Sequence, residues 1–261
     1  MQNSISLGRF RIIPVLLYSN DGLVKTTRFK NPKYIGDPIN ALKIFNDKEV
    51  DELIFLDINA SKEKRMPNLD LIKELATECF MPFCYGGGIS SIEEIQQILY
   101  NGAEKVSINT ASYTNPDLIK QAANKFGSQS IVVSIDVKKN WLNNQYVYIN
   151  NGTTNTKLSP IEFAKKMQDY GAGELMLNSI DRDGTYTGYD INLIKEVSES
   201  VDIPIIACGG AANISDFKNA INSGASAVAA GSMFVFYGEL KSVLINFPSP
   251  EDLNTLYTQV K

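Results

Sequence analysis

Two stretches of the sequence align with each other without a gap, at a spacing of 122 residues. The matching pairs of positions are Pro82 and Pro204, Gly87 and Gly209, Gly88 and Gly210, Gly102 and Gly224, Val106 and Val228, and Thr110 and Ser232. A unit that occurs twice in one chain is expected to fold twice into the same local structure. The repeat therefore favours an architecture that is built from two similar halves.

Each copy has the same order of segments: a short apolar run that ends in glycines, an amphipathic run, a second apolar run, and then small residues. This order predicts a strand, a helix, a strand and a turn. Glycine lets the backbone approach an oxyanion closely, and the N–H groups of a following helix supply hydrogen-bond donors. A Gly-Gly pair alone indicates only a turn. Two copies, each followed by a hydroxyl side chain at Thr110 or Ser232, favour two phosphate sites.

The pattern along the chain predicts alternating strands and helices. The predicted strands cover residues 11–17, 52–58, 81–85, 105–108, 131–135, 174–177, 203–207 and 227–230. The predicted helices cover residues 38–46, 69–79, 91–100, 115–126, 159–170, 192–200 and 213–222, with one or two more near the C-terminus. Residues 138–158 break this rhythm and predict a small β-hairpin after the fifth strand.

Eight strand–helix units with an internal repeat predict an α/β fold, a (β/α)8 TIM barrel built from two similar half-barrels. We expect a single domain over residues 1–261, with half-barrels of about 1–125 and 126–261. A doubly wound open sheet is the alternative.

Composition excludes several classes of function. The net charge is −4, and a domain that follows a polyanion needs a concentrated Lys/Arg surface, so no nucleic acid is expected as a partner. The chain has no histidine, which excludes Ser-His-Asp catalysis and His-ligated zinc. We expect no metal and no cofactor, and acid–base chemistry then falls to carboxylates or lysines.

The N-terminal residues 1–8 lack the apolar core of a signal peptide, and no apolar run has membrane-spanning length. The three cysteines, Cys79, Cys84 and Cys208, cannot all pair and have no Cys-x-x-Cys spacing. These features predict a cytoplasmic protein with reduced thiols and no membrane contact.

Carboxylates at the ends of predicted strands are the candidate catalytic groups, because barrel enzymes place their chemistry there. Asp136 ends an apolar strand, and a catalytic role is favoured over a capping role. Asp183 follows the sixth strand within Asp-Arg-Asp-Gly-Thr, which offers too few oxygen ligands for calcium. We therefore predict that Asp183 is a second acid–base group. The repeat also predicts a carboxylate at the end of the first strand, where the chain has Leu17.

Motifs spread over residues 11–239 resemble the cyclase subunit of imidazole glycerol phosphate synthase, HisF. They are Arg11-Ile12-Ile13-Pro14, Phe55-Leu56-Asp57-Ile58, Gly86-Gly87-Gly88-Ile89, Lys105-Val106-Ser107-Ile108-Asn109-Thr110-Ala111, Phe126-Gly127-Ser128-Gln129, and Asp181-Arg182-Asp183-Gly184-Thr185. The resemblance implies a doubly phosphorylated ligand. It assigns one phosphate to Gly87, Gly88, Asn109 and Thr110, and the other to Gly184, Gly209, Gly210, Gly231 and Ser232.

The resemblance also implies an ammonia gate at the opposite, N-terminal face of the barrel. By position, the gate residues are Arg11, Glu52, Lys105 and Glu174. Without the resemblance, these residues are equally well interpreted as salt bridges that close the barrel bottom. A gate requires that ammonia arrives from below, so the resemblance implies a glutaminase (HisH-type) subunit docked on this face.

The first strand departs from the pattern of that family, which has a catalytic aspartate where this chain has Leu17. A general acid–base group contributes a factor on the order of 10² to 10⁴ in rate, so ordinary cyclisation is expected to be severely impaired. Tyr85 is also larger than expected beside the glycines. This combination resembles a diverged HisF paralogue associated with acetamidino modification of surface sugars.

Three other interpretations stay open. In the first, the chain is a genuine cyclase subunit of histidine biosynthesis that uses Asp57 or Lys25 in place of the missing acid. Alternatively, it is a non-catalytic partner that binds and activates the glutaminase. The related isomerase of the same pathway fits less well, because it has no use for the basal ring of charges.

Overall fold

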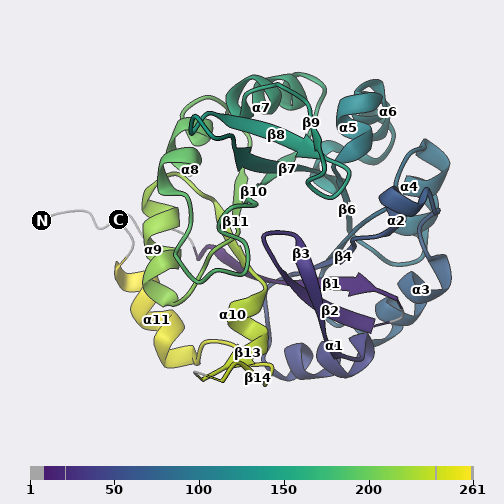
Figure 1. Cartoon of the computed structure of the whole chain (residues 1–261). Helices are drawn as coiled ribbons and strands as arrows, with labels where there is room; N and C mark the ends of the chain where they lie inside the picture. The colour runs from purple at the N-terminus through teal and green to yellow at the C-terminus, as the bar shows by residue number, and fades with distance from the viewer. Residues whose placement is uncertain (1–8, 21, 239, 260–261) are drawn as a thin grey trace, which may run out of the picture.

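The computed structural model describes residues 9–20, 22–238 and 240–259. Residues 1–8, where the sequence predicts no signal peptide, lie outside this part. Eight parallel strands form the centre of the fold (Figure 1). They are β1 (Arg11–Ser19), β4 (Leu53–Asp57), β5 (Phe83–Gly86), β6 (Lys105–Ile108), β7 (Ile131–Lys139), β10 (Glu174–Ser179), β11 (Ile205–Cys208) and β12 (Ala227–Ala230).

The strands close into a ring. Each pairs in parallel with the next in the list, and β12 pairs with β1, with Arg11 opposite Ala227. An open doubly wound sheet would leave two free edges, so the closed ring excludes that alternative and confirms the predicted TIM barrel.

Helices surround the barrel, as Figure 1 shows. They are α1 (Pro38–Asp47), α3 (Leu69–Glu78), α4 (Ile92–Tyr100), α6 (Asp117–Phe126), α7 (Pro160–Asp169), α8 (Ile191–Ser198), α9 (Ile214–Asn222) and the C-terminal α11 (Pro250–Gln259). Short helical segments occupy the loops: α2 (Ala60–Glu63), α5 (Thr110–Thr114), α10 (Ser232–Val235) and the 3₁₀ turn Ser128–Ser130. None of the described helices is long and apolar enough to span a membrane.

Alternate residues of each barrel strand point to opposite faces, and this alternation creates two apolar cores. The larger core lies between the strands and the helices. The smaller one fills the barrel and contains Ile13, Val15, Ile54, Cys84, Val132, Met176, Ile206, Cys208, Ala227 and Ala229. Burial of this apolar surface is the main stabilising contribution to the fold.

The repeat in the sequence has a counterpart in local geometry. Ser91 begins α4 with a capping box to Glu94, and Asn213 begins α9 with the same device to Asp216. Asn109, before α5, has φ −108° and ψ −77°, and Gly231, before α10, has φ −107° and ψ −75°. Equivalent positions of the two copies therefore have the same backbone conformation and the same caps.

Two antiparallel hairpins extend barrel strands. β7 continues to Lys139 and pairs with β8 (Gln145–Ile149), which pairs with β9 (Thr154–Asn155), and this confirms the predicted insertion. β1 pairs with β2 (Gly22–Thr27), which pairs with β3 (Lys30–Gly36), and the sequence analysis missed this second hairpin. Its turn contains Arg28 and Phe29 at φ 54° and 60°, where tight hairpins usually have Asn-Gly, so the usual turn signal was absent.

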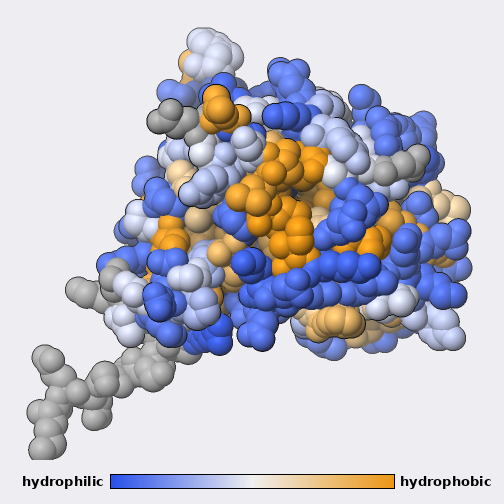
Figure 2. Space-filling model, turned by 90° about the horizontal axis from the view of Figure 1, so that it is seen from below, coloured by the Kyte–Doolittle hydropathy of each residue, from blue (hydrophilic) through white to orange (hydrophobic). Residues whose placement is uncertain are grey.

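A short hairpin of β13 (Phe236–Tyr237) and β14 (Ser242–Val243) follows α10. Figure 2 shows apolar side chains gathered on the side of the barrel that carries α1, β13 and β14. Exposed apolar residues in and next to these elements are Ile44, Tyr237, Leu240, Val243 and Leu244. The Lys33 ammonium lies 5.3 Å from the centre of the Phe236 ring, so this hairpin also contacts β3.

Candidate functional site

A cavity of about 130 Å³ lies at the carboxyl ends of the barrel strands. It brings together all of the predicted catalytic and phosphate-binding residues. They are Gly87, Gly88, Asn109, Thr110, Asp136, Asp183, Gly184, Gly209, Gly210, Gly231 and Ser232. Residues more than 120 positions apart in the chain therefore contribute to one site.

Glycine is required at the turns that line the cavity. Gly87 has φ +124°, and a Cβ atom there would lie 2.4 Å from the carbonyl oxygen of Asp57. Gly209, its equivalent in the second copy, has φ +89°, and a Cβ atom would lie 2.6 Å from Oδ1 of Asn178. No other residue fits these positions without a shift of neighbouring atoms, so both turns require glycine.

Neighbouring loops hold the hydroxyl and amide groups beside the glycines. The Asn109 amide donates to the carbonyl of Ser134 at 3.1 Å, and the Thr110 hydroxyl accepts from the backbone N–H of Asn150 at 3.1 Å. On the other side, the Tyr186 hydroxyl donates to the carbonyl of Ser232 at 3.1 Å. The hairpin that follows β7 thus holds Thr110, the hydroxyl residue that belongs to the Gly87–Gly88 copy of the repeat.

Asp136 is buried at the end of the barrel portion of β7. Burial and the nearby charge of Asp183 raise the pKa of Asp136 from 3.8 to about 7, although hydrogen bonding from Asn178 and Ser134 lowers it. A carboxyl group with this pKa is partly protonated at neutral pH. It can therefore donate or accept a proton, which is what general acid–base catalysis requires.

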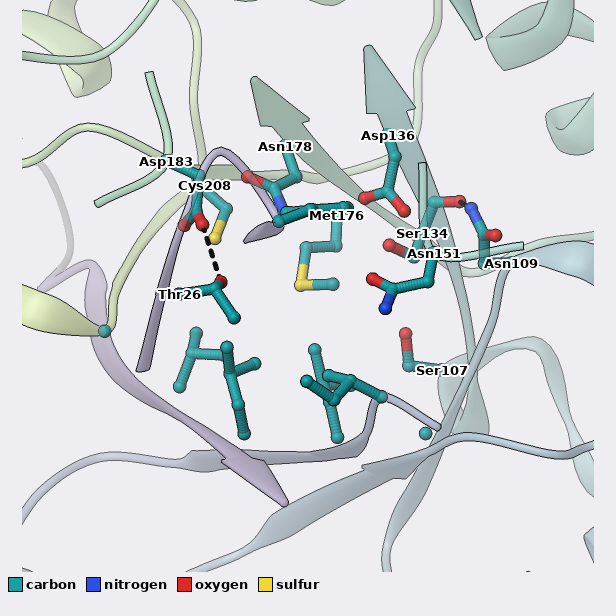
Figure 3. Close-up of a pocket in the computed structure, with 18 of the residues that line it drawn as sticks. Thr26, Ser107, Asn109, Ser134, Asp136, Asn151, Met176, Asn178, Asp183 and Cys208 are labelled. Atoms are coloured by element: carbon teal, nitrogen blue, oxygen red, sulfur yellow. Dashed lines mark hydrogen bonds between the residues drawn. The ribbon is translucent and has the colours of Figure 1, made fainter. Parts of the chain in front are cut away.

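Asp183 and Lys25 form a second titratable pair. Burial raises the pKa of Asp183 to about 6, against the opposing influence of Lys25 and the Thr26 hydroxyl, which donates to the carboxylate at 3.3 Å (Figure 3). Burial lowers the pKa of Lys25 to about 8, although the charge of Asp183 opposes this shift. The Lys25 ammonium donates to the carbonyl of Val15. At neutral pH this pair is mainly charged.

The wall opposite these polar groups is hydrocarbon. Leu17 lines the cavity beside Val15 and Leu56, and it lies next to Leu56 across the β1–β4 pairing. In Figure 3, Asp136, Asn178 and Asp183 lie on one side, and side chains without polar atoms lie on the other. Among the described residues that line the cavity, the carboxylates are Asp57, Asp136 and Asp183.

Asp57 is occupied by structural contacts. Its Oδ1 atom accepts from the backbone N–H groups of Asn59 and Ala60, each at 3.1 Å. Arg65 donates to both carboxylate oxygens, at 3.2 and 3.3 Å. Asp57 therefore fixes the loop after β4, and this weakens the idea that it replaces the missing acid of the first strand.

Tyr85 does not reach the cavity. Its ring is fully buried on the outer side of the barrel and stacks on Phe55 with centroids 6.3 Å apart. Its large side chain therefore packs away from the glycine turns, because alternate residues of a strand point to opposite faces.

The sequence analysis missed several residues of the site. Thr26 and Phe29 reach the cavity from the missed hairpin. Asn178 reaches it from β10, two positions after the inward-facing Met176. Continuing the strand's alternation past residue 177 would have identified Asn178, because a polar residue at an inward-facing strand end is unusual for an apolar core.

The predicted gate residues meet at the opposite end of the barrel. Arg11 pairs with both Glu52 and Glu174. Lys105 also pairs with both, each at 3.0 Å, so two cations and two anions form a closed ring. Burial alone would lower the pKa of Lys105, but the negative charges of Glu174 and Glu52 outweigh the effect of burial and raise the pKa above its ordinary value. Lys105 therefore stays charged.

The ring and the cavity are separated by apolar side chains. None of the ring residues lines the cavity, and Ile54, Cys84 and Val132 belong to the core that fills the barrel. A small molecule that entered at the ring would therefore meet an apolar barrel interior before it reached the cavity.

The fold and the cavity define a (β/α)8 barrel whose functional groups gather at the carboxyl ends of its strands. A family model described as "Histidine biosynthesis protein" matches residues 11–241. A Pseudomonas aeruginosa protein named "Putative imidazole glycerol phosphate synthase subunit hisF2" is 52% identical over 249 residues, 95% of this chain and 98% of the relative.

Two further relatives agree with these matches. A Leptospira interrogans protein named "Putative imidazole glycerol phosphate synthase subunit HisF" is 48% identical over 249 residues, with coverage of 95% and 98%. An Endomicrobium trichonymphae protein named "Imidazole glycerol phosphate synthase subunit HisF" is 44% identical over 230 residues, 88% of each chain. The chain belongs to the histidine biosynthesis protein family, as a HisF-like member.

Proposed function

We propose that this chain is the HisF-type synthase subunit of a glutamine amidotransferase complex, and that it receives ammonia from a glutaminase subunit. We further propose that it has lost most of the ring-closing activity of an ordinary cyclase. The observation that carries this proposal is Leu17, a hydrocarbon side chain at the strand-one position of a cavity that otherwise holds Asp136 and two glycine turns.

The two glycine turns are proposed to bind two phosphate groups of one ligand. Both turns line the cavity with glycines at positive φ, and Thr110 and Ser232 bring a hydroxyl group to the same cavity. A ligand held at both ends lies across the cavity with its centre near Asp136, and positioning of this kind contributes strongly to catalysis. Asp136, with its pKa of about 7, and Asp183, with its pKa of about 6, then exchange protons with the ligand, while Lys25 supplies a positive charge.

The ring of Arg11, Glu52, Lys105 and Glu174 is proposed to be the entrance for ammonia. Its four charges balance one another, and the side chains of Glu52 and Glu174 are nearly inaccessible. Neutral ammonia can pass an apolar barrel interior that ammonium cannot, because an isolated charge is costly to desolvate. A glutaminase docked over the ring would release ammonia where it is protected from bulk water.

The proposed acceptor is an acetamido group on a surface sugar. Ammonia would form a new C–N bond to the amide carbon, the carbonyl C–O bond would break, and the oxygen would leave as water, which gives an acetamidino group. Val15, Leu17 and Leu56 support this proposal, because they offer an apolar wall for a methyl group where a cyclase would need an acid. The test uses glutamine labelled with ¹⁵N in its amide and an acetamido sugar. Label in the recovered sugar supports this acceptor, and its absence under conditions of active glutamine hydrolysis refutes it.

The central part of the proposal is tested by supplying ammonia and the phosphoribulosyl formimino substrate to the purified chain. We expect imidazole product to form at about 10² to 10⁴ times below the rate of an ordinary cyclase, because one acid–base group is missing. Turnover equal to that of an ordinary cyclase would refute the loss of ring closure.

Lys25 favours a second candidate, a genuine cyclase with a replacement acid. Its ammonium is buried at the cavity beside β1, and burial lowers its pKa to about 8, within reach of proton transfer at neutral pH. Under this alternative, Lys25→Met would abolish a substantial cyclase activity of the unmodified chain. Under our proposal there is little such activity to lose.

A further inference from the structure

Two aromatic side chains stand almost fully exposed at the N-terminal end of the barrel. Phe80 is 85% exposed in the loop that leads into β5, and Tyr100 is 90% exposed at the end of α4, before β6. Loops that lead into barrel strands lie at the same end as the ring of Arg11, Glu52, Lys105 and Glu174. Large exposed aromatics are costly to leave in water, and at interfaces they often carry most of the binding energy.

The two aromatics belong to one surface, because the segments that carry them touch. A Cβ atom on Gly102 would lie 2.6 Å from Cβ of Ala76, so the turn after Tyr100 packs directly on α3, the helix before Phe80. The Glu104 carboxylate accepts from the backbone N–H of Phe83 at 2.8 Å. These contacts join the two loops on either side of the aromatic pair.

The backbone that presents the pair is fixed. The Asn46 carboxamide accepts from the backbone N–H of Phe80 at 3.1 Å and donates to the carbonyl of Glu78 at 2.6 Å. Tyr100 ends a regular helix, and the Asn101 amide donates to the carbonyl of Gln97 at 2.8 Å. A preorganised surface loses less conformational entropy on binding, so these aromatics are suited to act as anchors.

The N-terminal end of the barrel that carries the pair is acidic. Exposed carboxylates at the ends of helices and in the loops that lead into the barrel strands are Asp47, Glu49, Glu104, Asp169, Glu199 and Asp202, and Arg9 and Lys48 are exposed cations at the same end. The ring itself contributes no net charge. A partner for this end of the barrel would therefore carry basic side chains around an apolar recess, because complementary charge speeds and directs association.

We infer that Phe80 and Tyr100 are the anchor residues for the glutaminase subunit, which would present an apolar recess with a basic rim. The inference rests on the proposed function, and it deepens it by placing the partner's contacts on one sector of the N-terminal face. Continuity supports this placement: Tyr100 ends α4, and the loop that follows it contains Glu104 and leads directly to Lys105 of the ring. A partner seated on this sector would reach the ring.

The test measures binding of the purified HisH-type glutaminase of the same cell to the full chain and to three variants by titration calorimetry. They are Phe80→Ala, Tyr100→Ala and the double variant, and Trp141→Ala is the control. Trp141 is 87% exposed but lies on the hairpin at the other end of the barrel. We expect each single change to weaken binding by about tenfold or more, as interface anchors do, and the control to bind like the unmodified chain.

The charge of the partner is tested in the same titrations. We expect Glu104→Lys to weaken binding and added salt to weaken it further, because exposed charges are screened. If the unmodified chain forms a complex and the double variant binds with equal affinity, this inference is overturned while the proposed function stands. If the unmodified chain forms no complex, the inference and the proposed partner fall together.

Discussion

At the scale of single residues, the proposed loss of ring closure depends on Leu17, where the resemblance to HisF implies an aspartate. Its side chain lines the cavity on the apolar wall, across from the polar groups that include Asp136. A carboxylate at this position would provide the second proton-handling group that the resemblance to HisF implies. The rest of the site, including both glycine turns, is already in place.

Restoring this carboxylate gives the first prediction. We expect Leu17→Asp to raise residual cyclisation by about tenfold or more, because a positioned acid–base group contributes on the order of 10² to 10⁴. Leu17→Asn is the matched control, since it has the same shape but cannot exchange a proton near neutral pH. Equal rates for the two variants would show that the missing acid is not what limits cyclisation.

Asp136 gives a second prediction, on stability. Its folded pKa of about 7 lies above the ordinary 3.8, so between these values the folded chain binds a proton that the unfolded chain has released. Stability contributed by this group is therefore lost as pH rises from about 4 to about 7. Asp136→Asn removes this loss. We expect the change in the free energy of unfolding that the substitution causes to be more favourable at pH 8 than at pH 4, by about 2 kcal/mol or more.

Denaturant unfolding at the two pH values measures this difference. Asp169→Asn, an exposed carboxylate on the outer side of α7, serves as the control and should show no comparable change. A stability difference for Asp136→Asn that is the same at pH 4 and pH 8 would contradict a raised pKa at this position.

At the scale of elements, strands and helices of the barrel were predictable, because apolar runs and cap residues mark them locally. β6 and β12 have the predicted bounds, and Ser91 caps α4 through a capping box with Glu94. The β2–β3 hairpin was not predictable in this way. Its two turn positions, which have positive φ, are Arg28 and Phe29 instead of the usual asparagine and glycine. Their conformation is set by distant contacts, such as the hydrogen bond from the backbone N–H of Arg28 to the carbonyl of Asp183.

The two capping boxes give the third prediction. Ser91 and Asn213 occupy equivalent positions of the repeat and make the same two kinds of hydrogen bond. We therefore expect Ser91→Ala and Asn213→Ala to lower the free energy of unfolding by similar amounts, about 1 kcal/mol each. Thr77→Ala, which changes an exposed residue in the last turn of α3 that is itself not a cap, should stay within about 0.5 kcal/mol. A large effect at one cap and none at the other would contradict the equivalence of the two copies.

At the scale of the whole molecule, the closed ring of strands brings the two halves of the repeat to one cavity. The sequence predicts which residues line this cavity, because glycine turns and polar strand ends are local signals. It does not predict that Thr26 and Asn178 join them, since their placement depends on the missed hairpin and on strand alternation. The division into halves near residue 125 stays a prediction.

The ring of charges at the barrel floor gives the fourth prediction. Lys105 pairs with Glu52 and Glu174, both nearly inaccessible, so Lys105→Met leaves buried charge uncompensated and should cost about 3 kcal/mol or more. Glu174→Gln in the same chain removes part of the unbalanced charge, and we expect the double variant to be less destabilised than the sum of the single changes. Denaturant unfolding of all four chains measures this coupling. Additive effects would mean that the ring is not a coupled unit.

The most direct test of the account uses the whole complex. The chain, its glutaminase, glutamine and the phosphoribulosyl formimino substrate are combined, and glutamate and imidazole product are measured in the same vessel. The account predicts that the chain stimulates glutamate formation while almost no imidazole product appears. Imidazole product formed in equal amount to glutamate would contradict it.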